Sequence, residues 1–153
     1  MTGEPRPVPA RGVDARYQDP RVILATLRSA RTVAIVGLSP DALRPSSAIG
    51  SYLQRHGYRI VPVNPREKEI LGETSYPSLG AIPFPVDVVD VFRRSETVPE
   101  IARDAVAIGA KALWLQLGVT SPEGARIAEA GGLAVVMDRC MQVEHARHLG
   151  STR

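Results

Sequence analysis

This sequence is poor in cysteine and in aromatic residues, and it has no long hydrophobic run. Cys140 is the single cysteine among 153 residues. An internal disulfide is therefore excluded, which is typical of proteins in a reducing cytoplasm. No apolar run approaches the ~18 residues that a membrane helix needs. The N-terminus contains arginine and proline without the apolar stretch of a secretory signal. We therefore expect a cytoplasmic protein with no membrane partner.

The excess of positive charge is confined to the start of the chain. Residues 1–31 contain six arginines and three acidic residues, a net charge of 6 − 3 = +3. The remaining 122 residues contain 13 basic and 13 acidic side chains, so their net charge is zero. A nucleic-acid-binding fold usually has a basic face on its core, together with aromatic residues or a recognisable module. Neither is evident here, so we expect no nucleic-acid partner.

Hydrophobic patterning divides the chain into a leader and one domain. Residues 1–18 are rich in arginine and proline and lack periodicity, which predicts a flexible leader before a single domain over residues 19–153. From there, short apolar runs alternate with helical patterns. The expected strands are 32–36, 58–63, 86–92, 112–117 and 133–137, and the expected helices follow Asp19, Arg44, Thr97, Ser121 and Arg139. Such alternation predicts an α/β fold, a parallel sheet with helices on both faces. Residues 69–85 are expected to form a loop with one helical turn.

The stretch Thr32–Ser39 is the most informative part of the chain. A β-branched apolar run ends at Gly37, and a glycine there lets the backbone approach a ligand closely. A helical pattern begins after Arg44, and a second strand ends at Asn64. A strand, a glycine turn, a helix and a second strand within 34 residues predict a nucleotide-binding βαβ unit.

Polar, small or cationic residues follow every predicted strand. They are Gly37-Leu38-Ser39 with Arg44, Ser46 and Ser47, then Asn64-Pro65, Phe92-Arg93-Arg94, Gln116-Leu117-Gly118-Val119 and Asp138-Arg139-Cys140. In open α/β sheets, ligands bind outside the carboxyl ends of the strands. Arginines and serines beside a helix N-terminus are suitable donors for phosphate oxygens. The pattern predicts a phosphate-rich small molecule at this edge.

Two common nucleotide-binding motifs are absent. A dinucleotide fingerprint requires G-x-G-x-x-G, whereas this chain reads Gly37-Leu38-Ser39-Pro40-Asp41-Ala42. A dinucleotide-binding domain has an acidic residue after its second strand, whereas this chain has Asn64 at that position. No G-x-x-x-x-G-K-[ST] sequence occurs either. These departures argue against a dehydrogenase and against an NTPase.

Five separated motifs carry a resemblance to a known family. They are Gly37-Leu38-Ser39, Arg44-Pro45-Ser46, Gly57-Tyr58 to Asn64-Pro65, Asp90 to Arg94, and Lys111 to Gly118 with Asp138-Arg139-Cys140. In this order they resemble the small stand-alone bacterial CoA-binding proteins, from about Asp19 to His148. The domain of that family is related to the N-terminal CoA-binding domain of the succinyl-CoA synthetase α subunit.

The resemblance implies a Rossmann-like, doubly wound, five-stranded parallel sheet of order 3-2-1-4-5 that holds coenzyme A or acyl-CoA. The pantetheine arm would follow Gly37–Ser39 and Gln116–Gly118, the phosphates would lie near Arg44, and the adenosine near Asn64. The residues implied in binding are Gly37, Leu38, Ser39, Arg44, Ser46, Ser47, Asn64, Pro65, Phe92, Arg93, Gln116, Gly118 and Cys140. Two alternatives to a CoA-binding protein remain: an adenine-nucleotide sensor, and a ligase-like subunit that needs a partner chain. A homodimer or a further protein partner fits the exposed edges of such a sheet, although no residue requires one.

No constellation typical of catalysis falls on the predicted edge. Glu144, His145 and His148 lack a further well-placed ligand, so we expect no metal site. Asp90 shares a face with apolar neighbours and is expected to be buried and hydrogen-bonded. Cys140 opens a helix beside the predicted site, which favours a thiolate, and we hypothesise that it forms a mixed disulfide with CoA under oxidising conditions.

Overall fold

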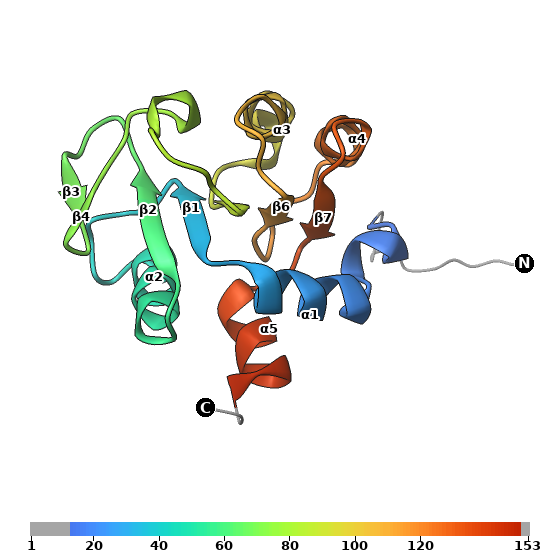
Figure 1. The fold of residues 1–153 in the computed structure, drawn as a ribbon, viewed down its shortest axis with the longest axis horizontal. Helices are drawn as coiled ribbons and strands as arrows, with labels where there is room; N and C mark the ends of the chain where they lie inside the picture. The colour runs from blue at the N-terminus through green and yellow to red at the C-terminus, as the bar shows by residue number, and fades with distance from the viewer. Residues whose placement is uncertain (1–12, 151–153) are drawn as a thin grey trace, which may run out of the picture.

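Five parallel strands form the centre of the molecule in a computed structural model, which describes residues 13–150 (Figure 1). The strands are β1 (Thr32–Val36), β2 (Arg59–Val63), β5 (Val88–Val91), β6 (Ala112–Leu115) and β7 (Ala134–Met137). Nearly all of their residues are buried, as in parallel sheets that are covered on both faces. The predicted Rossmann-like α/β fold is therefore confirmed.

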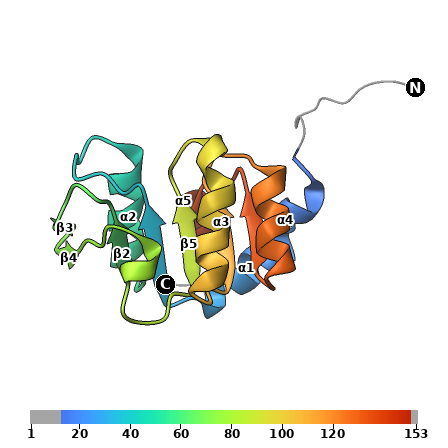
Figure 2. The ribbon, with the colours of Figure 1, turned by 90° about the horizontal axis from the view of Figure 1, so that it is seen from above.

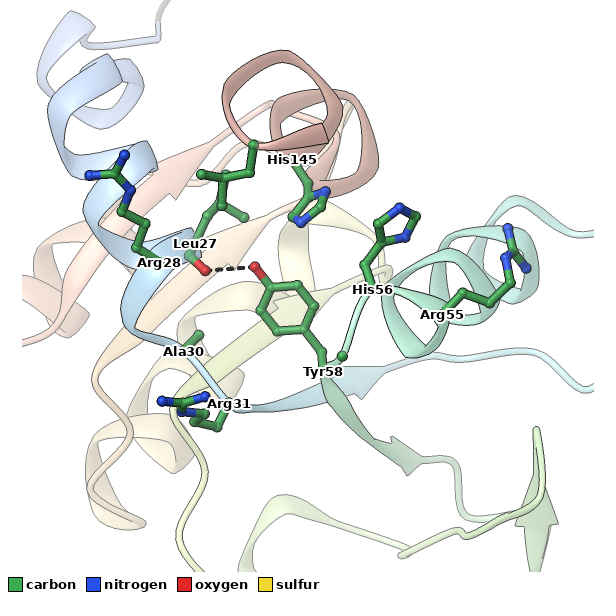
Figure 3. Close-up of a pocket in the computed structure, with 10 residues that line it drawn as sticks. Leu27, Arg28, Ala30, Arg31, Arg55, His56, Tyr58 and His145 are labelled. Carbon is green, nitrogen blue, oxygen red and sulfur yellow. Dashed lines mark hydrogen bonds between the residues drawn. The ribbon is translucent and has the colours of Figure 1, made fainter. Parts of the chain in front are cut away.

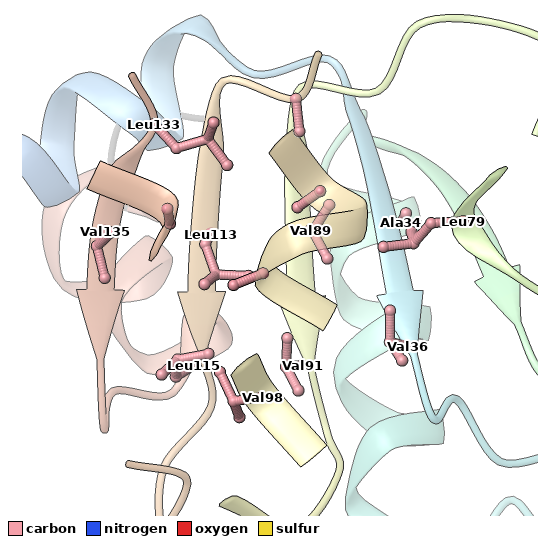
Figure 4. Close-up of a cluster of buried hydrophobic side chains, with 14 of the residues drawn as sticks. Ala34, Val36, Leu79, Val89, Val91, Val98, Leu113, Leu115, Leu133 and Val135 are labelled. Atoms are coloured by element: carbon pink, nitrogen blue, oxygen red, sulfur yellow. The ribbon is translucent and has the colours of Figure 1, made fainter. Parts of the chain in front are cut away.

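Helices cover the two faces of the sheet unequally (Figures 1 and 2). One face carries α1 (Pro20–Ser29), α2 (Pro45–Arg55) and α5 (Met141–His148), and the other carries α3 (Val98–Ala107) and α4 (Pro122–Ala130). A hydrophobic core lies between the sheet and each helical layer. Figure 4 shows the core beneath α3, where Val89 and Leu113 of the sheet lie close to the helix. None of the helices among the described residues is long and apolar enough to cross a membrane.

The helix N-termini follow the local sequence signals in two of three cases. The carboxylate of Asp19 accepts a hydrogen bond from Arg21 N, and the hydroxyl of Ser121 accepts one from Gly124 N. Thr97 does not cap α3, because its hydroxyl donates to the Arg94 carbonyl oxygen instead. A 3-10 turn, η3 (Ser95–Thr97), precedes that helix and places Thr97 in a helical conformation, which removes the extended geometry a cap requires.

The order of the strands in the sheet is β2-β1-β5-β6-β7. Counted along the five strands alone this is 2-1-3-4-5, whereas the expected order 3-2-1-4-5 places the third strand beside the second. β5 instead pairs with β1 and β6. Part of the outer edge of β2 is already occupied, because Tyr76 N donates to the Pro62 carbonyl and Asn64 N donates to the Tyr76 carbonyl. Both orders are doubly wound, and here the winding reverses between β1 and β5.

The segment between β2 and β5 contains more structure than a loop. A short hairpin, β3 (Glu69–Ile70) and β4 (Glu73–Thr74), precedes the 3-10 turn η2 (Leu79–Ala81). The single helical turn was expected, and the hairpin was not. Its strands contain two residues each, which is too short for an alternating pattern to be recognised.

The residues directly before α1 pack against the domain. Residues 1–12 of the expected leader lie outside the described residues, but η1 (Ala15–Gln18) forms a 3-10 turn. Tyr17 is only 4% exposed and donates a 2.7 Å hydrogen bond to the carboxylate of Glu129 on α4. Residues 13–18 are therefore not a flexible leader, and the packed domain begins before residue 19.

Candidate functional site

A cavity of about 560 Å³ lies at the carboxyl ends of the parallel strands. Its walls come from the first turns of α2, the ends of β5 and β6, and the start of α5. The lining residues are Pro45, Ile49, Phe92, Arg93, Arg94, Gln116, Leu117, Val119 and Cys140. The cavity is next to the point where the winding of the sheet reverses between β1 and β5. This is where ligands bind in doubly wound sheets.

Gly37 ends β1 with a positive φ of 93°, in a conformation that favours glycine. A Cβ atom at this position would lie 2.8 Å from the carbonyl oxygen of Phe92 and 2.9 Å from Cδ of Arg93. Its N–H group donates to the Val63 carbonyl. The absence of a side chain therefore accommodates the backbone leaving β5. The expectation that Gly37 also lets a ligand approach the backbone stays a prediction.

The loop between β1 and α2 is held by serine hydroxyl groups. Ser39 N donates to Oγ of Ser46 over 3.0 Å, and Asp41 N donates to Oγ of Ser39 over 3.0 Å. Ser46 and Ser47 are 5% and 6% exposed in the first turn of α2. Arg44 precedes that turn with an exposed side chain that makes no capping hydrogen bond. The predicted phosphate donors thus gather at one helix N-terminus, where free N–H groups favour anions.

Asn64 joins the loops that follow β1 and β2. Its side-chain Nδ2 donates to the Leu38 carbonyl over 3.1 Å, and its Oδ1 accepts from Arg66 N over 2.8 Å. The side chain of Leu38 is fully buried in the core. Pro65 is exposed beside this junction. The hydrogen bonds of Asn64 therefore brace the two loops, and the contacts of Leu38 and Asn64 with a ligand stay predictions.

The far side of the cavity is held by hydrogen bonds that join the residues after β6 to the turn after β7 and to the start of α5. Gln116 is 5% exposed, and its Oε1 accepts from Met141 N over 3.3 Å. Gly118 N donates to Oδ1 of Asp138 over 2.7 Å. Cys140 is half-buried at the N-cap of α5 and lines the cavity. These contacts fix the chain reversal beside the cysteine.

Asp90 is buried directly below this edge and lacks the expected hydrogen bonds. It is 0% exposed, and neither carboxylate oxygen has a partner among the described residues. Its strand register places it between Ile35 of β1 and Trp114 of β6. Burial raises the pKa of the Asp90 carboxyl well above its usual range, because the charged form loses its hydration.

The cavity combines an apolar lining with cations at its edge. Pro45, Ile49, Phe92, Leu117 and Val119 provide most of the wall. The side chains of Arg93 and Arg94 are exposed, and Arg94 Nε lies 3.7 Å from Oε2 of Glu96 in an exposed ion pair, a type that contributes little to stability. Such a lining suits an extended apolar or amide-bearing group with an anionic end.

Four of the predicted residues line the cavity, namely Phe92, Arg93, Gln116 and Cys140. Gly37, Leu38, Ser39, Arg44, Ser46, Ser47, Asn64, Pro65 and Gly118 do not line it, and they belong to the loops at the same edge. The list of residues implied in binding omits five lining residues, Pro45, Ile49, Arg94, Leu117 and Val119. The strand-end pattern had already placed Arg94, Leu117 and Val119 at this edge. Pro45 and Ile49 are revealed only by the packing of α2.

Glu144, His145 and His148, the acidic and histidine residues considered as metal ligands, lie together on α5. Oε1 of Glu144 lies 3.4 Å from Nε2 of His148, whereas Nδ1 of His145 is 2.9 Å from the hydroxyl of Tyr52. Within residues 13–150, no group of three histidine, cysteine or acidic side chains is arranged to hold a metal ion. The two imidazoles therefore contact different partners.

The doubly wound sheet and the cavity at the carboxyl ends of its strands define a Rossmann-like domain. Residues 31–146 match the CoA binding domain family, so the chain belongs to that family. It is 38% identical over 120 residues to the uncharacterized protein YneT of Bacillus subtilis, covering 78% of this chain and 89% of YneT.

Two further relatives show the range of the family. A solved structure, a hypothetical protein from Pyrococcus horikoshii OT3, is 37% identical and superposes with a TM-score of 0.80 over 97% of this chain and 100% of the other. The ADP-forming acetate–CoA ligase II of Archaeoglobus fulgidus is 32% identical over 101 residues. That match covers 65% of this chain but only 15% of the ligase. The domain thus occurs both as a small protein and as a minor part of a large enzyme.

Proposed function

We propose that this protein binds coenzyme A or acyl-CoA at the carboxyl edge of its sheet and does not itself catalyse a reaction. The observation that carries the proposal is the cavity of about 560 Å³ beside the reversal of strand order, in a chain that belongs to the CoA-binding family. Its volume lies within the ~300–1,000 Å³ typical of small-molecule sites.

The apolar lining suits the pantetheine arm and its thiol end. Pantetheine is a long, thin chain with amide groups, and Phe92 and Ile49 offer it an apolar surface. Leu117 is 66% exposed at the rim, where contact with the arm would remove its side chain from water. On this arrangement the thiol, or an attached acyl group, lies toward Cys140.

The cationic edge suits the phosphates. Arg44 is exposed and directly precedes α2. Arg93 follows β5, the strand that pairs with β1. Both side chains can reach outward from the sheet edge, and free N–H groups of the first turn of α2 add a partial positive charge. The adenosine would then lie toward Asn64 and Pro65, as the resemblance implies.

Calorimetric titration of the purified protein with CoA, acetyl-CoA, NAD and ATP tests the proposal. We expect CoA and acetyl-CoA to bind with a stoichiometry of one, and NAD and ATP to bind at least about tenfold more weakly, because they lack the pantetheine arm. Binding of ATP or NAD without CoA would favour an adenine-nucleotide sensor instead. Turnover of acyl-CoA by the isolated chain would overturn the non-catalytic assignment.

A further inference from the structure

The side-chain amide of Gln18 bridges two residues of the turn that follows β7. Its Nε2 donates a 3.1 Å hydrogen bond to the carbonyl oxygen of Met137, the last residue of that strand. Its Oε1 accepts a 3.1 Å hydrogen bond from Nη2 of Arg139. These two partners flank Asp138, and Cys140, which lines the cavity at the carboxyl edge, follows them directly. A residue at the start of the described chain thus contacts the wall of the candidate site.

The bridged turn has a backbone conformation that needs support from its surroundings. Asp138 has a φ of 60°, in the left-handed region that residues with a side chain rarely adopt. Such a conformation persists where neighbouring contacts hold it. Oδ1 of Asp138 accepts a 2.7 Å hydrogen bond from Gly118 N, and the Gln18 amide holds the residue on either side. Because Asp138 turns the chain from β7 into α5, its conformation sets the position of Cys140 in the cavity wall.

Arg139 uses both its backbone and its side chain to bind other parts of the protein. Its guanidinium donates to Gln18 and, over 3.0 Å, to the carbonyl oxygen of the preceding residue. Its N–H donates to the carbonyl oxygen of Leu115 over 3.3 Å, and its own carbonyl oxygen accepts a 2.8 Å hydrogen bond from Nε1 of Trp114. Arg139 therefore joins Gln18 to the end of β6, directly before the cysteine at the cavity.

The segment that carries Gln18 has a fixed position. The preceding residue, Tyr17, is buried and donates a 2.7 Å hydrogen bond to Glu129 on α4. Helix α1 begins two residues after Gln18, and its far end is held to β2, because the Tyr58 hydroxyl donates a 2.6 Å hydrogen bond to the Leu27 carbonyl oxygen. Figure 3 shows this bond at the amino-terminal edge of the sheet. Gln18 is thus placed by contacts on both sides of it in the chain.

We propose that Gln18 is a positioning residue of the CoA site: through Arg139 it fixes the turn that carries Cys140, and with it the wall that faces the pantetheine arm. This inference rests on the CoA-binding function proposed above. An amide suits the role because it donates to a carbonyl group and accepts from a guanidinium group at once. Glutamate keeps only the acceptor, and leucine keeps neither. Gln18 lies before residues 31–146, so the site depends on a contact from outside the part of the chain that matches the family.

Calorimetric titration of Gln18→Leu with three ligands tests the proposal. CoA and pantetheine both contain the arm, so we expect each to bind about tenfold more weakly than to the wild type. Adenosine 3′,5′-bisphosphate lacks the arm, and its affinity should not change. Gln18→Glu, which keeps the acceptor for Arg139, should recover part of the loss. The matched control is Arg16→Ala, in the same segment, because Arg16 pairs with α4 and not with the turn. It should leave all three affinities unchanged.

The fluorescence of Trp114 gives a second readout that needs no ligand. Trp114 is the single tryptophan of the chain, and its indole N–H binds the Arg139 carbonyl oxygen. In the ligand-free protein, Gln18→Leu should shift its emission to longer wavelength, because a loosened turn admits water to the buried ring. Arg16→Ala should leave the emission unchanged.

Two results would overturn the positioning role. One is an affinity of Gln18→Leu for CoA equal to that of the wild type. The other is an equal loss for all three ligands together with a lower melting temperature, which would show that Gln18 acts through overall folding. Failure of the wild type itself to bind CoA would count against the CoA-binding function, and the emission of Trp114 would still decide whether Gln18 holds the turn.

Discussion

The backbone N–H of Ser39 donates a 3.0 Å hydrogen bond to the hydroxyl oxygen of Ser46, across the loop that joins β1 to α2. Both residues were expected to donate to phosphate. The structure shows that one of them also fixes the position of the other. The hydroxyl of Ser46 is therefore occupied as an acceptor while its proton remains available to a ligand.

Ser46→Ala should destabilise the protein by about 1 kcal/mol, because a hydrogen bond of the loop is lost. Ser47→Ala is the matched control, since Ser47 is equally buried in the same turn and its hydroxyl has no such contact within residues 13–150. Urea unfolding and CoA titration of both variants measure the difference. If stability is unchanged and both variants lose CoA affinity alike, Ser46 acts only as a phosphate donor.

Arg44→Ala should weaken CoA binding by about 1.5–3 kcal/mol, the range for a hydrogen bond to a charged group. Pantetheine has no phosphate, so its binding should scarcely change. Calorimetry with both ligands makes the comparison, with Arg103→Ala on α3 as a control for surface charge. Equal losses for CoA and pantetheine would show that Arg44 acts through folding or through the arm.

Gly37→Ala should cost more stability than Gly132→Ala, although the two glycines have similar φ angles of 93° and 88°. Either substitution forces a side chain into a left-handed conformation at a cost of about 1–2 kcal/mol. Only at Gly37 does the new Cβ meet backbone, 2.8 Å from the Phe92 carbonyl oxygen, and such overpacking adds about 1–3 kcal/mol. Urea unfolding of both variants tests this, and equal losses would mean that the Phe92 backbone moves aside freely.

Asp90 should make the protein less stable as pH rises. Its carboxyl has a raised pKa in the folded state and an ordinary pKa of about 3.9 in the unfolded state, so the folded protein binds more protons between the two values. The associated stability is fully present below pH ~4 and is lost as the pH rises through the folded-state pKa, at up to about 1.4 kcal/mol per pH unit.

Thermal unfolding of Asp90→Asn at a series of pH values checks this sign. The asparagine does not titrate, so the stability of this variant should fall less steeply above pH ~4 than that of the wild type. Asp104→Asn, at an exposed position of α3, is the control and should keep the decline. Parallel curves for wild type and Asp90→Asn would show that Asp90 does not titrate with folding.

Cys140 should exchange with CoA disulfide under oxidising conditions, when one half of the disulfide occupies the cavity. The Cys140 thiolate attacks one sulfur of CoA disulfide, a protein–CoA disulfide forms, and one CoA leaves as a thiolate. Intact mass spectrometry should show one CoA adduct on the wild type, its removal by dithiothreitol, and no adduct on Cys140→Ser. Absence of an adduct in a protein that binds CoA would leave Cys140 as a packing residue.

Much of the fold could be predicted because its signals are local. The β-branched run at Thr32–Val36 and the caps at Asp19 and Ser121 depend on neighbours within a few residues, and all three form as expected. The capping box predicted at Thr97 does not form, because Thr97 belongs to the preceding turn, η3, and has a helical backbone conformation. Local signals are thus reliable until an adjoining element competes for the same residue.

The candidate site was predicted less completely than the fold. Strand-end residues such as Arg93 and Gln116 were found because all carboxyl ends of parallel strands share one edge. Ile49 was not found, because an apolar helical residue has the same pattern whether it faces a core or a cavity. The bracing position of Asn64 was also hidden, since its partners follow different strands.

The sequence alone determined the alternation of strands and helices, because burial and backbone preference act over a few neighbouring residues. Tertiary structure alone decided that β5 lies between β1 and β6, because buried apolar strands resemble one another and their pairing depends on non-local hydrogen bonds. It also decided that Gly37 accommodates the backbone of Phe92, and it brought Gln116 against the first turn of α5. Contacts between distant residues carry no local pattern, so only the folded chain reveals them.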